Sequence, residues 1–372
     1  MWEAALAAPS PGAHSGIPGE ARTVTRGGHR SPRRNPAQHE LRVLRLPEIS
    51  GSSSLIAQLP CAAAENCTRI GGFVLRGLAE QAGPRGVLFA LFLLIYSATL
   101  LGNLGMVSLI RAEPQLHTPM YFFLSVLAIV DSGFSTANTP GLLGGLLASS
   151  QSVSFAGCVI QMGLMTLHGT AECLILAVMA YDRFAAICRP LLYGSLLSPR
   201  LCVQLVAATY AASVASSALL TGNVFSLPYC GPNIINHYFC DIPPVLQLAC
   251  RDRARAEAVI FPSAALILLC TITFTLVSYG FILVTICRMR SLDAQSKALS
   301  TCGSHLALIC LFYGTATFMY TQPSSRSSTE QNKVVSVFYT VIIPMLNPLI
   351  YSLRNKDVKA ALKKRCLGLL PS

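Results

Sequence analysis

The sequence has few charged residues. Asp, Glu, Lys and Arg make up 12% of its 372 residues, whereas 52% are hydrophobic. Soluble globular chains carry roughly 25% charged residues. So little charge cannot solvate the exterior of two or three soluble domains, which argues against a water-soluble enzyme and favours a lipid-facing exterior. The net charge of +12 must then be interpreted by its location along the chain.

The sequence also lacks the pattern of a signal peptide. The early apolar run from Trp2 to Ala8 is short and interrupted by Glu3. Residues 1–60 are rich in Pro, Gly, Ser and Ala, carry scattered arginines and show no helical or strand period, so we expect a disordered basic extension. The first membrane span would then act as its own insertion signal.

Long apolar runs dominate the rest of the chain. A helix needs about 20 apolar residues to cross a hydrocarbon core about 30 Å thick, and backbone in lipid must satisfy its own hydrogen bonds. The runs are too long and too little alternating for barrel strands. The sequence therefore predicts an all-α membrane protein, a bundle of seven transmembrane helices. The predicted spans are Gly86 to Ile110, Met120 to Leu143, Cys158 to Tyr181, Leu201 to Thr221, Ala258 to Cys287, Ala298 to Tyr320 and Val334 to Leu353.

Basic residues fall unevenly on the two sides of these spans. Thirteen lie in the loops and tail on the carboxyl-terminal side, and five lie in the opposite loops. The positive-inside rule then makes the carboxyl terminus cytoplasmic and the amino terminus extracellular, although Arg69, Arg76 and Arg85 run against it locally. We expect an extracellular segment at 61–85 with a glycosylation sequon at Asn66. A transmembrane domain at 86–353 and a cytoplasmic basic tail at 354–372 follow.

Half of the 14 cysteines lie in spans, where a thiol behaves as a small apolar side chain. Cys158 lies at the outer end of the third span, and Cys230, Cys240 and Cys250 lie in the second outer loop. On an oxidising face these four can form two disulfides. Their spacing alone allows three pairings, of which we predict Cys158 with Cys240 and Cys230 with Cys250. The alternative is a zinc site that lacks the usual short paired spacings, with ligands His237, Cys240 and Asp241.

Acidic residues are scarce inside the spans. Only Asp131 in the second span and Glu172 in the third occur there, with no Lys or Arg at their depth. A charge at mid-bilayer costs about 2.5–3.5 kcal/mol on insertion scales, so both should face the bundle interior. They indicate a bound sodium ion or a shared proton, or equally a neutral network that only packs helices. Candidate amide neighbours are Asn103 and Asn347, and the histidines expected to be packing residues are His168 and His305.

Asp182 and Arg183 are adjacent at the cytoplasmic end of the third span. A neighbouring carboxylate can hold an arginine until something competes for it, although arginines at helix ends also snorkel without a function. The seventh span contains prolines that free carbonyls and kink membrane helices. Its interrupted stretch comprises Pro344, Asn347, Pro348 and Tyr351.

Together these residues resemble rhodopsin-like G-protein-coupled receptors, and odorant receptors in particular. The resemblance runs without a gap from about Asn66 to Lys364. Several long motifs in this order are more specific than any one alone. The motifs are LHTPMYFFLS (Leu116 to Ser125), MAYDRFAAICRP (Met179 to Pro190), HYFCDIPPVLQLAC (His237 to Cys250), SYG (Ser278 to Gly280), KALSTCGSHL (Lys297 to Leu306) and PMLNPLIYSLRN (Pro344 to Asn355).

The resemblance implies that a small volatile odorant binds in the outer half of the bundle. A mostly apolar pocket with a few hydroxyls suits weakly polar organic molecules. Any single position of this kind is more often a helix-packing residue. The matching positions are Met165, Thr166, Gly169, Thr170, Ser263, Ile267, Tyr313, Ala316, Thr317 and Tyr320.

The resemblance also implies a receptor in the plasma membrane that activates a stimulatory heterotrimeric G protein of the olfactory type and raises cyclic AMP. The ligand can move the sixth helix outward only through its differential affinity for the two states. Membrane lipids are the other expected partner, and nucleic acid is not expected. The implied switch residues are Asp182, Arg183, Tyr279, Asn347, Pro348 and Tyr351. The sequence departs from the family at Phe184, Arg189 and Tyr210.

Other functions stay open at this point. One is a rhodopsin-like receptor for a small molecule that is not an odorant. A transporter or channel is disfavoured because seven spans show no inverted repeat. An enzyme is disfavoured because Asp131 and Glu172 are not joined by a His-rich metal set or by a nucleophile with its base. No cofactor is expected apart from the sodium ion.

Overall fold

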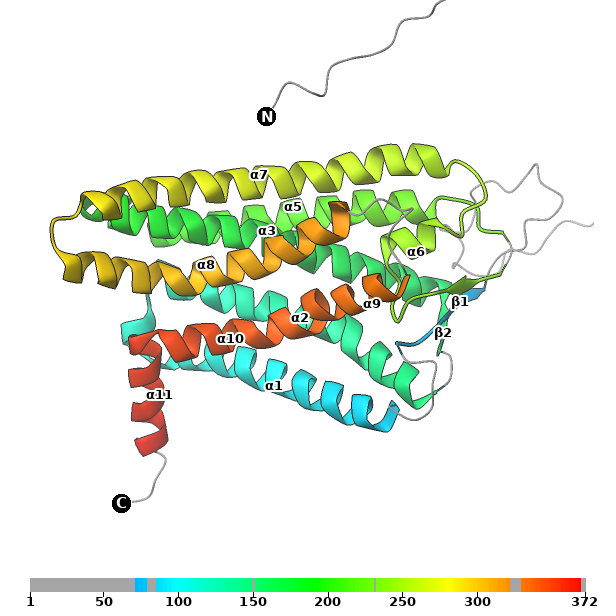
Figure 1. Ribbon diagram of the computed structural model, residues 1–372, viewed down its shortest axis with the longest axis horizontal. Helices are drawn as coiled ribbons and strands as arrows, with labels where there is room; N and C mark the ends of the chain where they lie inside the picture. The colour runs from blue at the N-terminus through cyan, green and yellow to red at the C-terminus, as the bar shows by residue number, and fades with distance from the viewer. Residues whose placement is uncertain (1–70, 79–84, 149–150, 231, 322–328, 369–372) are drawn as a thin grey trace, which may run out of the picture. The chain divides into compact units, whose positions relative to one another are not determined.

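The apolar runs fold into long helices that lie side by side (Figure 1). The computed structural model describes residues 71–78, 85–148, 151–230, 232–321 and 329–368, which all belong to one unit, residues 59–372. The helices are α1 (Arg85–Ala112), α2 (Pro119–Leu147), α3 (Phe155–Cys188), α5 (Pro199–Phe225), α7 (Arg253–Arg288), α8 (Leu292–Thr321), α9 (Thr329–Val337) and α10 (Ile343–Arg354). A π-helical turn, η3 (Phe338–Ile342), joins α9 to α10.

Six segments of the described chain are long and apolar enough to cross a bilayer on their own, and the last of these is Lys333–Tyr351. Helix α8 supplies a seventh span that is bent by 45° between Leu292–Ser300 and His305–Thr317. Gly303 and Ser304 lie at the break, and Gly and Ser pairs favour kinks. Each predicted span coincides with one of these segments to within three residues at its carboxyl end or lies inside it, so the seven-helix architecture is confirmed.

Two prolines reshape the last span. Pro344 and Pro348 have no N–H, so the carbonyls four residues earlier, on Thr340 and Pro344, lose their helical donors. The π-helical turn η3 lies directly before this stretch. The carbonyl of Pro344 accepts a hydrogen bond from Asn103 Nδ2 of α1 at 2.9 Å instead. Helix α1 approaches α10 closely at this point: a Cβ added at Gly102 would lie only 3.0 Å from Pro348 Cγ.

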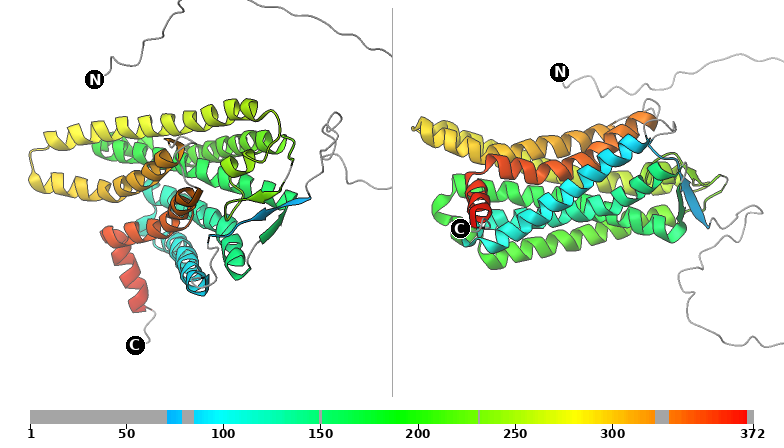
Figure 2. Two further views of the ribbon diagram at one scale, coloured as in Figure 1. Left: turned by 45° about the vertical axis from the view of Figure 1, so that its right-hand side comes forward. Right: turned by 90° about the horizontal axis from the view of Figure 1, so that it is seen from below.

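One end of the bundle carries a small sheet that was not expected from the sequence (Figures 1 and 2). Strand β1 (Gly72–Leu75) pairs antiparallel with β2 (Gln151–Ser154) and parallel with β3 (Ile234–Ile235). The short helix α6 (Ile242–Leu246) follows β3. Phe73 packs beneath the sheet in a hydrophobic cluster with residues of α3, α5 and α7. We refer to this end as the sheet end.

The opposite end carries the short connections η1 (Pro114–Leu116), η2 (Pro190–Leu192) and α4 (Tyr193–Leu196). Beyond α10 the chain turns into α11 (Lys356–Gly368), which Figure 1 shows projecting across the line of α10. The sequence predicted only a basic tail at 354–372, so this helix is an addition to that expectation. We refer to this end as the α11 end.

Candidate ligand pocket and switch residues

A buried ion pair lies at the α11 end of α3. Arg183 Nε donates to Asp182 Oδ2 at 2.9 Å, and Arg183 Nη2 also contacts this oxygen. The other carboxylate oxygen, Oδ1, accepts a hydrogen bond from the Tyr193 hydroxyl of α4 at 2.7 Å. Asp182 is 0% and Arg183 only 6% exposed, so this arginine does not snorkel to water. The geometry is that of a charge lock closed by a third residue.

Tyr193 was not identified from the sequence, since no motif marks it. Burial raises the pKa of its hydroxyl, and the negative charge of Asp182 raises that pKa further. The phenol therefore stays protonated at neutral pH and donates to the carboxylate. We refer to Asp182, Arg183 and Tyr193 as the arginine lock.

Tyr279 and His305 connect α7 to α8 within the same hydrophobic core. The Tyr279 hydroxyl lies 2.9 Å from His305 Nδ1, and both side chains are buried. His305 was expected to be a packing residue, and it is also the direct partner of an expected switch residue. Tyr351, which is 0% exposed, packs into this core, and its hydroxyl has no hydrogen-bond partner within the described residues.

Asp131 and Asn347 meet between α2 and α10. Asn347 Nδ2 donates to Asp131 Oδ2 at 2.7 Å. Asn103, the other candidate amide neighbour, instead donates to the backbone of Pro344. Glu172 is buried close enough to Asp131 for their charges to interact.

Asp131 and Asn347 together offer some of the oxygen ligands that a sodium ion requires. Asp131 Oδ1 and Asn347 Oδ1 are buried and have no hydrogen-bond partner within the described chain. Carboxylate and amide oxygens are the ligands that hard cations prefer. No group of three or more His, Cys, Asp or Glu that could hold a metal occurs among the described residues. The donor set therefore fits a weakly held monovalent ion better than a structural metal.

The expected pocket residues on α3 are largely engaged with neighbours. Met165 is buried in a cluster that includes Tyr238 of the loop between α5 and α7. The Thr166 hydroxyl donates to its own helix, to the carbonyl of Met162 at 2.9 Å. The hydroxyls of Thr170 and Ser216 lie 3.3 Å apart and join α3 to α5. Next to the expected glycine position, Phe134 lies 3.9 Å from a Cβ built on Gly169.

The expected pocket residues on α7 and α8 include one that crosses to α3. The Tyr313 hydroxyl donates to the carbonyl of Cys173 at 3.2 Å, so α8 is tied to α3. Ser263 donates to the carbonyl of Val259 at 2.6 Å. Ile267 packs against the main hydrophobic core. Of the remaining positions, Ala316 is partly buried and Thr317 exposed, and the side chain of Tyr320 lies outside the described part of the structure.

Two disulfides fasten the loop between α5 and α7. Cys158 is bonded to Cys240, and Cys230 to Cys250. Of the three pairings that the spacing allows, the structure contains this one. The first bridge ties the loop to α3, and the Cys240 N–H also donates to Gln161 Oε1 of α3 at 3.0 Å. An oxidised Cys240 has no thiolate for a metal, so the zinc alternative is not supported.

The same loop also reaches the seventh span. His237 is 2% exposed and its Nε2 lies 3.3 Å from Ser336 Oγ of α9. Burial, assisted by the positive charge of Lys333, lowers the pKa of His237 to about 3, so the ring is neutral at physiological pH. Burial raises the pKa of Asp241, the N-cap of α6, to about 6. The sequence could not show this junction, since its partners lie 99 residues apart.

A charged clamp holds α11. Glu113, which precedes η1, is 4% exposed and accepts hydrogen bonds from Lys364 Nζ at 2.9 Å and Arg365 Nε at 3.0 Å. These hydrogen bonds keep the pKa of Glu113 below its usual value. Tyr121 adds a second contact, because its hydroxyl lies 3.1 Å from Asn355 Oδ1 at the start of α11. None of these residues was singled out from the sequence.

Comparison with known proteins identifies the family. Residues 92–368 match a family model described as olfactory receptor. Mouse olfactory receptor 5P56 is 52% identical over 308 residues, which cover 83% of this chain and 99% of that receptor. Mouse olfactory receptor 5P55 is 51% identical over 307 residues (82% and 99%), and mouse olfactory receptor 5AP2 is 50% identical over 300 residues (81% and 95%). The resemblance carried by the sequence motifs is thereby confirmed. The chain belongs to the olfactory receptor family of G-protein-coupled receptors, which are multi-pass membrane receptors and not enzymes.

Proposed function

We propose that this receptor binds small volatile organic molecules and, when occupied, activates a stimulatory heterotrimeric G protein of the olfactory type, so that cyclic AMP rises. The single observation that carries the proposal is the arginine lock. Arg183 is buried and held by a carboxylate whose second oxygen is occupied by Tyr193. It can be released only by a rearrangement of the surrounding helices, which a ligand drives by binding one arrangement more tightly.

We place the sheet end outside the cell and the α11 end in the cytosol, with the receptor in the plasma membrane. Both disulfides lie at the sheet end, and disulfides form and persist in an oxidising compartment such as the cell exterior. The basic residues of α11 lie at the opposite end, as the positive-inside rule requires. Glycosylation of Asn66 is part of the same proposal, and this residue lies outside the described part of the chain.

The ligand pocket is proposed in the sheet-end half, among the matching positions of α3, α7 and α8. Tyr313 is the position with the clearest route to the lock. Its hydroxyl bridges α8 to α3 at Cys173, and Tyr279 bridges α7 to α8 at His305. A ligand that displaces the Tyr313 hydroxyl would therefore loosen α8 from α3.

A sodium ion or shared proton at Asp131 is a secondary proposal. The unpartnered oxygens of Asp131 and Asn347 support it. Its test is the thermal stability of the purified receptor in sodium and in potassium buffers. A sodium-specific rise that disappears in Asp131→Asn supports the ion, and equal stability in both buffers excludes it.

The receptor proposal is tested with a cyclic AMP assay over a panel of volatile compounds. The assay compares wild type, Arg183→Ala and Arg189→Ala at matched surface levels. Arg189 is a matched control because it is an exposed arginine at the same end of α3. At least one volatile compound should raise cyclic AMP in wild type and in Arg189→Ala, and not in Arg183→Ala.

Three outcomes would contradict this proposal. A response that survives Arg183→Ala would exclude the role of the lock. A ligand-driven ion flux in that variant would favour a channel. A response only to involatile molecules would favour a receptor for another ligand class. The panel should be run with and without residues 1–60.

A further inference from the structure

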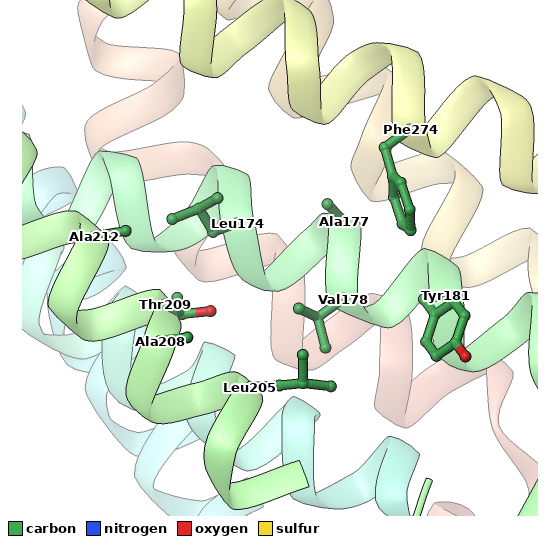
Figure 3. Close-up of a pocket in the computed structure, with 9 residues that line it drawn as sticks. All are labelled: Leu174, Ala177, Val178, Tyr181, Leu205, Ala208, Thr209, Ala212 and Phe274. Carbon is green, nitrogen blue, oxygen red and sulfur yellow. The ribbon is translucent and has the colours of Figure 1, made fainter. Parts of the chain in front are cut away.

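A cavity of about 500 Å³ lies between α3, α5 and α7, apart from the expected ligand pocket (Figure 3). Helices α5 and α7 each pack extensively along α3 and much less against each other, so α3 forms the floor of the space between them. None of the expected pocket positions whose side chains the structure describes lines it. Its lining residues are Leu174, Ala177, Val178, Tyr181, Leu205, Ala208, Thr209, Ala212 and Phe274.

Small side chains keep this cavity open, and we refer to it as the crevice. Ala208 and Ala212 are one helical turn apart on α5, and Ala177 is a small residue of α3 that also lines the space (Figure 3). Both alanines of α5 are exposed, and so is Phe274, so the crevice opens on the outer surface of the bundle, where the membrane lies. None of the described residues that line it is charged. Its volume is in the range of roughly 300–1,000 Å³ that is typical of small-molecule sites.

An aromatic row holds the walls of the crevice in place. The rings of Tyr181 and Phe274 lie 6.4 Å apart across α3 and α7, and the rings of Tyr181 and Phe184 lie 6.2 Å apart. Phe184 continues the row to Phe281 of α7 at 5.9 Å. Tyr181 directly precedes Asp182 in the chain. The crevice is therefore preformed, and it lies directly beside the arginine lock.

One hydroxyl that lines the crevice has no hydrogen-bond partner among the described residues. Thr209 is 5% exposed, and Figure 3 shows its oxygen directed into the space between α3 and α5. Among the described residues no side chain bonds to this hydroxyl, and the Ser213 hydroxyl donates instead to the Thr209 carbonyl at 2.8 Å. Polar groups at membrane depth are normally satisfied, because lipid offers no partner. A hydrogen-bonding atom of a molecule inside the crevice would therefore stabilise this hydroxyl.

We propose that this crevice is a second ligand site, entered from the lipid, for small apolar molecules that carry one hydrogen-bonding oxygen, such as medium-chain alcohols. A hydrocarbon chain gains little by leaving lipid for an apolar crevice, since lipid tails are as apolar as the walls. The hydrogen bond to Thr209 is the interaction that lipid tails cannot supply. It selects a molecule with an oxygen over a phospholipid acyl chain.

The proposal is tested by photolabelling the purified full-length receptor in lipid nanodiscs. The probe is an octanol with a diazirine on its chain, and the matched probe is the corresponding octane. Labelled peptides are mapped by mass spectrometry. The readout is the position of the label on the receptor and needs neither a G protein nor a signalling response, so its outcome is independent of the proposed receptor function.

The octanol probe should label the stretches 174–181 and 205–212. Thr209→Val keeps the side-chain shape and removes the hydroxyl, so it should lower octanol labelling about fivefold, the order expected for one net hydrogen bond. The same variant should leave octane labelling unchanged. Ala208→Leu fills the crevice and should abolish labelling there, whereas Ala211→Leu, at another exposed position of α5, should not.

Three results would overturn the proposal. The first is equal labelling by octane and octanol, and the second is octanol labelling that is unchanged in Thr209→Val. The third uses a phosphatidylcholine with a diazirine in its acyl chain. If this lipid labels the crevice and excess octanol does not displace it, the occupant is a lipid chain.

Discussion

The hydrogen bond between α1 and the proline-containing helix gives the sharpest energetic prediction. Asn103 is 1% exposed and its Nδ2 donates to the carbonyl of Pro344. Pro348 has no N–H, so no residue of the same helix can serve this carbonyl in the usual pattern. Asn103→Leu keeps roughly the same shape and leaves the carbonyl buried without its partner.

The expected cost can be worked from the environment. An unsatisfied buried acceptor costs about 1–3 kcal/mol, and side-chain hydrogen bonds measured within a membrane protein average about 0.6 and reach about 1.7 kcal/mol. We therefore expect Asn103→Leu to lower the free energy of unfolding by about 1 kcal/mol. For a domain of 150–250 residues this lowers Tm by about 2–4 °C, and somewhat less for this larger chain.

A double-mutant cycle isolates the cause. Pro348→Ala restores an N–H that can donate to the carbonyl of Pro344 in the usual helical pattern. In that background Asn103→Leu should cost almost nothing, so the coupling energy between the two sites should be about 1 kcal/mol. Ser108→Ala is the control on α1, because Ser108 is exposed and bonds only within its own helix.

Unfolding can be measured through cysteines that the receptor already contains. Cys173, Cys202 and Cys302 are buried free thiols, so a dye that fluoresces on reaction with thiols follows unfolding in nanodiscs. An equal loss of Tm for Asn103→Leu in the wild-type and Pro348→Ala backgrounds would show that Asn103 does not act through this carbonyl. The partner of the Pro344 carbonyl would then have no energetic importance.

Three further predictions concern the ends of the bundle. Cys158→Ser removes the bridge to Cys240 and should abolish surface staining of a tagged receptor; normal surface level with a normal ligand response would reject this role. Tyr193→Phe removes a hydrogen bond to the Asp182 carboxylate and should raise basal cyclic AMP by roughly tenfold at most, while unchanged basal signalling would contradict the lock. The clamp on α11 should be complete above pH 4.5, the usual pKa of Glu113, and should be lost as pH falls through the lower folded-state pKa. Glu113→Gln should accordingly speed hydrogen–deuterium exchange in α11 at neutral pH, and unchanged exchange would exclude the clamp.

Hydropathy and motifs were sufficient to identify the spans and the family. Lipid offers no hydrogen bonds, so a long apolar run has one stable conformation, and a helix can be predicted from hydropathy without any knowledge of its neighbours. The motif around Asp182 and Arg183 and the motif from Pro344 to Asn355 were also legible, because their residues are adjacent or within a few turns of one another.

Contacts between groups that are distant in the chain became visible only in the folded receptor. Asn103 and Pro344 lie 241 residues apart, and Glu113 and Arg365 lie 252 apart, so no local pattern relates the members of either pair. The sheet escaped prediction because β2 is a polar stretch of four residues and β3 has only two, and both become strands by pairing with β1. The crevice at Thr209 exists because α5 and α7 both pack on α3, and a gap between helices depends on their placement rather than on the composition of any one of them.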